Sequence, residues 1–154
     1  MIAAASTRSF DIAVVVHVLS AVAALVVVLT LRAAASGAAG AHGPSEASRR
    51  SFTGRRELAG RAMHLIPLTG LWVLAASRGA DTLASGFVIA GLALWLAGAV
   101  ALEAVAFPAQ RQVAASLDAD PAARVTAARR MLAATDVALA AILVAGIVMV
   151  ASQA

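Results

Sequence analysis

Four long apolar runs, separated by shorter polar segments, dominate the pattern of hydrophobic and polar residues along the 154-residue chain. The runs cover approximately residues 10–32, 58–77, 83–107 and 129–152. An α-helix rises about 1.5 Å per residue, so about 20 apolar residues cross the hydrocarbon core of a bilayer. Each run has about this length, and the pattern therefore predicts an all-α, four-helix transmembrane bundle.

The composition supports a membrane protein with a single domain, residues 1–154. Hydrophobic residues make up 62% of the chain and charged residues only 13%. A soluble domain of this size could not bury so much apolar surface, because turns and irregular segments need polar cover. The chain has no cysteine, which excludes disulfides, thiolate metal ligands and thiol catalysis.

Prolines refine the predicted helices. Pro67 lies inside the second run, where it should kink the helix and leave the carbonyl of Met63 without an intrahelical donor. Asp120 and Pro121 form a good N-cap and N1 pair, so we expect the last helix to begin there and to continue through the fourth run. Pro108 should close the third helix.

The arginines give the predicted helices an orientation. Most of them lie in or beside the first and third connections between the apolar runs, namely Arg32, Arg49, Arg50, Arg55, Arg56, Arg61, Arg111, Arg124, Arg129 and Arg130. Only Arg8 and Arg78 lie on the other side of the predicted membrane. Arginine is favoured on the cytoplasmic side, so we expect a multi-pass protein of the plasma (inner) membrane with both termini outside. Segments 33–57 and 108–128 become cytoplasmic loops, the first of them rich in Gly, Ala and Ser and therefore flexible.

The position of the arginines also indicates the partners of the chain. They lie at membrane edges and not on a soluble patch, which argues against nucleic acid as a partner. They should instead attract anionic lipid headgroups.

Four ionisable residues interrupt the apolar runs: His17, His64, Glu103 and Asp136. Such residues are rare in lipid and face a bundle interior, a water-filled cavity or the interface. Depths counted from the predicted topology place all of them except His17 in the cytoplasmic half. They could form a polar, proton-exchanging site, or the carboxylates could reach the interface and pair with an arginine such as Arg61, Arg129 or Arg130.

His17 and His64 also suggest a redox interpretation. Haem iron takes imidazole ligands, and helix bundles hold cofactors between facing helices, so these two residues are candidate axial ligands of a b-type haem. The counted depths of the two residues differ by about 10 Å, which counts against this arrangement. Two histidines without a carboxylate close by provide too few ligands for a metal ion, and we predict no metal site.

Small-residue helix faces are more abundant than residues with evident chemistry. Gly91 and Gly98 are seven residues apart and share a face on which another helix can approach closely. No catalytic triad, phosphate-binding loop or nucleophile elbow occurs in the sequence. The leading hypothesis is a small non-enzymatic membrane protein, either an accessory subunit with a protein partner or a homo-oligomer. The alternatives are a haem- or metal-binding redox module that uses His17 and His64, and a proton-linked small-solute carrier that uses His64, Glu103 and Asp136.

Two stretches carry a family resemblance. The run Ala13–Ala24 (AVVVHVLSAVAA) resembles the first helix of small four-helix bacterial predicted integral membrane proteins of unknown function, and Gly60–Leu74 (GRAMHLIPLTGLWVL) is similar to their second helix. That group is itself similar to the copper-resistance D-type membrane domain. The resemblance implies a four-helix membrane fold, and its copper-handling relatives would use histidines and methionines. Only His17 and His64 match that use here, because the methionines do not cluster.

Overall fold

The computed structural model describes residues 2–40, 42–53, 61–79 and 82–152. It is 87% helical, and no strand occurs in the described residues, which confirms the predicted all-α class. In chain order the elements are α1 (Ile2–Ala39), α2 (Glu46–Thr53), the 3₁₀ turn η1 (Arg61–His64), α4 (Leu65–Ala76), α5 (Gly86–Val100), the π-helical segment η2 (Ala101–Ala106), α6 (Phe107–Ser116) and α7 (Pro121–Ala151).

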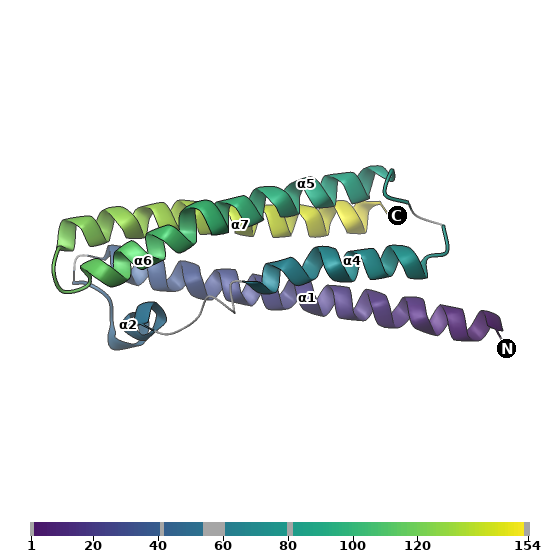
Figure 1. Ribbon diagram of the computed structural model, residues 1–154, viewed down its shortest axis with the longest axis horizontal. Coiled ribbons are helices and arrows are strands. Elements are labelled where there is room, and N and C mark those ends of the chain that lie inside the picture. The colour runs from purple at the N-terminus through teal and green to yellow at the C-terminus, as the bar shows by residue number, and fades with distance from the viewer. Residues whose placement is uncertain (1, 41, 54–60, 80–81, 153–154) are drawn as a thin grey trace.

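The long helices run side by side (Figure 1). Helix α1 packs against α4 and α7, and α7 packs against the continuous rod formed by α5, η2 and α6. Both termini and the connection from α4 to α5 lie at one end of the molecule, which we call the outer end. The short helix α2 and the turn between α6 and α7 lie toward the opposite end, which we call the basic end.

Three of the rods are long and apolar enough to cross a membrane: Arg8–Ala39, Gly86–Ser116 and Pro121–Ala151. The fourth apolar helix, Ala62–Ala76, is shorter and reaches about 22 Å. Three such rods are compatible with an integral membrane protein, and the short fourth rod sets this bundle apart from four equal crossings.

The segments predicted as loops are largely helical. Helix α1 continues past Arg32 to Ala39, and α2 occupies residues 46–53. Alanine has the highest intrinsic helix propensity, and Ala34, Ala35 and Ala38 in the extension of α1 are buried. A loop was therefore the wrong expectation for this part of 33–57. In the second segment, α6 and the start of α7 leave only a short turn. The predicted start of α7 is confirmed, because the Asp120 carboxylate accepts hydrogen bonds of 3.0 Å from the backbone N–H groups of Ala122 and Ala123.

Pro108 does not end the third helix as the sequence suggested. The rod instead widens into the π-helical segment η2, where the N–H of Phe107 bonds the carbonyl of Leu102, five residues back. Proline lacks an N–H and its ring crowds the carbonyl four residues earlier, so a π-helical turn lets the rod continue past it. Glu103 lies in this segment.

The hydrophobic core lies between the middle of the bundle and the basic end. Its largest fully buried side chains are Val28, Met63, Leu102, Val113, Met131 and Thr135. Many small alanines fill the space between them and bring the helices close together. Toward the outer end the helices bury much less, and α4 has no buried residue.

Candidate functional site

On each rod, the exposed hydrophobic surface begins or ends close to one ionisable residue. On α1 the exposed large hydrophobic side chains stop at Leu29, just before Arg32, and on α7 they begin at Val137, directly after Asp136. On α4 they begin at Leu65, directly after His64. On the α5–η2 rod they continue to Val105, around Glu103, and end there. We call Arg32, His64, Glu103 and Asp136 the polar belt.

The belt separates two kinds of surface. Among the described residues, no large hydrophobic side chain is exposed in segments 33–53 and 106–136, on the basic side of the belt. On the outer side, exposed leucines, isoleucines and valines cover every rod. This division places the belt at the level where a hydrocarbon layer would end and headgroups would begin.

Two belt residues that sequence analysis grouped together are in contact. His64 Nε2 lies 3.1 Å from Glu103 Oε1, and both side chains are about half exposed. The Trp95 ring meets the His64 ring edge-on, with 6.0 Å between the centroids and an interplanar angle of 74°. The predicted proximity of His64 and Glu103 therefore agrees with the geometry, in a contact that joins η1 to η2.

Asp136 pairs elsewhere. Its Oδ1 lies 2.5 Å from Arg32 Nε on α1, and both side chains are about half exposed. Among the described residues, Asp136 is thus paired with Arg32, and His64 with Glu103. An arginine partner was expected for the carboxylate, but Arg32 was not foreseen because it lies 104 residues away in the chain.

Trp95 has a specific polar partner as well as its packing role. Its Nε1–H donates a 3.1 Å hydrogen bond to the carbonyl of Met63. That carbonyl is the one that Pro67 was expected to leave without a donor, because Pro67 lies four residues later in the chain and has no N–H. The helix begins as the 3₁₀ turn η1 and becomes α-helical at Leu65, so Pro67 lies in the first turn of α4.

A double-mutant cycle tests this partnership. Trp95→Phe should lower the free energy of unfolding by about 2 kcal/mol, because it leaves a half-buried carbonyl without its donor and also removes ring contacts. Pro67→Ala supplies an N–H to the same carbonyl, so the cost of Trp95→Phe should fall by about 1 kcal/mol in that background. Equilibrium unfolding of the four proteins in detergent micelles measures the coupling, and strictly additive costs would contradict the assignment.

His17 is held in a separate contact nearer the outer end. Its Nδ1 lies 2.9 Å from Thr69 Oγ1, and the threonine hydroxyl lies 2.8 Å from the carbonyl of Leu65, to which it donates. The hydroxyl oxygen therefore accepts a hydrogen bond from Nδ1–H of His17, so the proton of the neutral ring is on Nδ1 and not on Nε2. A Cβ at Gly70 would lie 3.3 Å from His17 Cε1, so the glycine gives the buried imidazole its room.

The two histidines have different partners, Thr69 for His17 and Glu103 for His64. Thr69, the partner of His17, lies five residues beyond His64, which is about 7 Å along the helix axis. His64 already directs Nε2 at a carboxylate. The predicted haem site would need both imidazoles at one level, and it stays a prediction that these contacts do not favour.

On the basic side, polar contacts fasten the helix ends to one another. Arg124 is 9% exposed and its Nε donates a 3.2 Å hydrogen bond to the carbonyl of Ala38, in the last turn of α1. A cation at a helix C-terminus satisfies free carbonyls and the helix dipole. Gly43, with φ of 75°, brings the backbone next to the same guanidinium.

A second basic-side contact joins α2 to the turn after α6. Arg49 donates from Nη2 to Asp118 Oδ1 at 2.5 Å and from Nη1 to Oδ2 at 3.3 Å. This hydrogen bond and the opposite charges lower the pKa of the Asp118 carboxyl and raise the pKa of Arg49. The paired carboxylate therefore keeps its charge to lower pH than a free one, and the contact is lost only in acid.

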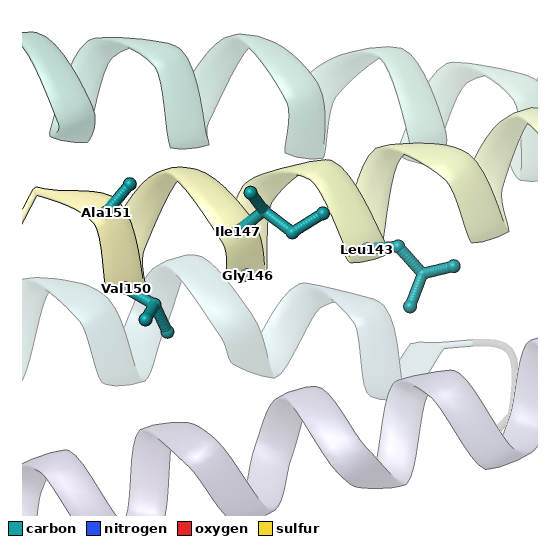
Figure 2. Close-up of a pocket in the computed structure, with 5 residues that line it drawn as sticks. All are labelled: Leu143, Gly146, Ile147, Val150 and Ala151. Atoms are coloured by element: carbon teal, nitrogen blue, oxygen red, sulfur yellow. The ribbon is translucent and has the colours of Figure 1, made fainter.

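An open apolar groove of about 480 Å³ runs along the outer half of α7 (Figure 2). Its lining consists of Leu143, Gly146, Ile147, Val150 and Ala151. No polar side chain is among them, so the groove offers surface suited to hydrocarbon and no group for chemistry.

Within the described residues, no three His, Asp or Glu side chains gather in an arrangement that could hold a metal ion. No protein-family model, curated protein or solved structure matches the chain.

Proposed function

We propose that the chain is a multi-pass protein of the plasma membrane, with the polar belt at the inner hydrocarbon boundary. The basic end then lies in the cytoplasm and both termini lie outside. The charges on the two sides of the belt support this orientation, since eight of the ten arginines in the part of the chain that the structure describes lie at the belt or on its basic side. In this arrangement α6, α2 and the first part of α7 form a helical extension at the headgroups and beyond.

We further propose that the protein is a non-enzymatic accessory or self-associating subunit. The observation that supports this proposal is the small fraction of residues that the apolar rods bury within the monomer. Only 28%, 17% and 22% of the residues in the most apolar stretches of the three long rods are buried within the monomer. Their remaining surface is available to lipid or to another membrane helix, whereas each polar belt side chain already has a partner within the chain.

Site-specific cross-linking tests the proposed association. The chain has no cysteine, so single Leu68→Cys and Ile147→Cys variants place one thiol on the exposed outer faces of α4 and α7. The chain also has no lysine, so the reagent is a thiol-reactive photo-crosslinker that inserts into C–H bonds of a neighbouring side chain. In native membranes it should give a discrete adduct for at least one of the variants, and mass spectrometry would identify the adduct as a dimer or as a complex with a larger protein.

Arg129→Cys, on the exposed basic side of α7, is the matched control and should give no discrete adduct. A monomer without adducts at either outer position, in membranes that contain the native complement of proteins, would contradict the proposal. Recovery of the chain in the soluble fraction would contradict the membrane placement itself.

A further inference from the structure

The apolar band of this molecule has a measurable height, because both of its edges are marked by polar residues. The inner edge is the polar belt. At the outer edge, α4 is followed by Ser77 and Arg78, and α7 is followed by Ser152. Ser85 precedes α5, and its hydroxyl accepts a 3.1 Å hydrogen bond from the N–H of Thr82 within the outer turn.

The band is low on two of the four rods. From His64 to Ser77 the axial rise is about 20 Å, and from Asp136 to Ser152 it is about 24 Å. Any tilt of a helix reduces these heights further. The hydrocarbon core of a typical bilayer is about 30 Å thick. The α1 segment between Asp11 and Arg32 matches it at about 31 Å, and the α5–η2 rod from Ser85 to the exposed Val105 matches it at about 30 Å.

The inner edge resists adjustment because its residues are paired across helices. Arg32 is tied to Asp136 and His64 is tied to Glu103, so no single rod can sink without breaking a polar contact. At the outer edge, Arg78 is exposed and adopts φ of 56° in the turn that ends α4. A thicker hydrocarbon layer would therefore have to cover polar side chains at one edge or the other.

We propose that the partner surface of this protein is a thin lipid bilayer: phospholipids with short acyl chains, whose hydrocarbon layer is several ångströms below the usual thickness. The deficit is greatest beside α4. A rod that is too short for its bilayer is accommodated by thinning of the lipid, and lipids that are already thin avoid this cost. This inference rests on the membrane placement proposed above.

The test is reconstitution of the full chain into phosphatidylcholine vesicles whose monounsaturated chains range from about 14 to about 22 carbons. Thermal unfolding is followed by the fluorescence of Trp72 and Trp95, on α4 and α5. The midpoint should be highest with the shortest two chain lengths and should fall by about 5–10 °C in the longest. A midpoint that peaks at intermediate or long chains, or that does not change, would overturn the inference.

A variant with a taller band gives the second readout. Ser77→Leu combined with Arg78→Leu replaces the two polar residues that end the apolar part of α4 and should move the optimum toward longer chains. Ala119→Leu, in the exposed turn at the basic end, adds apolar surface away from the band and should leave the optimum unchanged. Flotation of the vesicles separates the two levels of failure. Protein that does not float contradicts the membrane placement, whereas protein that floats but unfolds without the expected dependence contradicts only the thin-bilayer inference.

Discussion

Gly98→Leu is expected to lower the free energy of unfolding by about 3 kcal/mol, at the upper end of the range for overpacking a core. A Cβ at Gly98 would overlap the Cε methyl of Met63 and would lie 3.6 Å from Cα of Ala138 on α7. Met63 is itself 2% exposed, so its methyl has no open space to enter. A leucine side chain would force α5 away from α7 at this contact. Denaturant titration in mixed micelles, monitored by helical circular dichroism, measures the loss.

Gly91→Leu is the matched control, because a Cβ at Gly91 has no neighbouring atom within 4 Å. It adds the same side chain one face-repeat away on the same helix and should cost less than about 1 kcal/mol. Equal destabilisation by the two variants would contradict the packing argument. The two glycines were predicted to act together as a close-approach face, and within the monomer only Gly98 does so.

Met131→Ala should lower the free energy of unfolding by a similar amount, because it removes buried volume where Gly98→Leu adds it. The side chain is 0% exposed in the core on the basic side of the belt, and its removal leaves a cavity between α7 and its neighbours. Truncation of a fully buried methionine costs about 2–5 kcal/mol. Because this part of the core lies beyond the polar belt, the loss should be similar in micelles and in vesicles of different lipid composition.

Met149→Ala provides the comparison at the other end of the same helix, where the side chain is only partly buried. It should change stability by less than about 1 kcal/mol. If Met149→Ala proved as costly as Met131→Ala, the packing of the outer half would be much tighter than the burial pattern indicates. The same denaturant titration applies to both variants.

The local features of this fold could be read from single stretches of sequence. The apolar runs locate the rods, and the Asp120–Pro121 pair locates the start of α7, because both signals act within a few residues. The freed carbonyl of Met63 could also be anticipated, since it follows from the covalent structure of Pro67. Its donor, Trp95, could not, because the partner depends on how two hairpins pack.

The candidate site shows the same limit. Glu103 could be placed near His64 from depth alone, because the positive-inside pattern predicts a direction for every helix. Arg32 was taken as the end of a crossing, although α1 continues beyond it, since alanine-rich sequence is compatible with both a loop and a packed helix. The sequence did not show that Asp136 pairs with Arg32 while His64 pairs with Glu103. To predict these pairs one must know how each helix is rotated about its axis, and a nearly uniform apolar run does not encode that rotation.

The length of α1 has a mechanical consequence. Its 38 residues contain no proline. Its last turns are held by a hydrogen bond from Arg124 of α7 and by the close approach of α2 at Gly37. The opposite end of α1 projects about 36 Å beyond this grip, counted from Asp11 to residue 35. A pivot of about 10° at the gripped end would sweep the far end sideways by about 6 Å, taken from that rise. Because the contact of His17 with Thr69 ties α1 to α4, such a pivot would have to carry both helices sideways together.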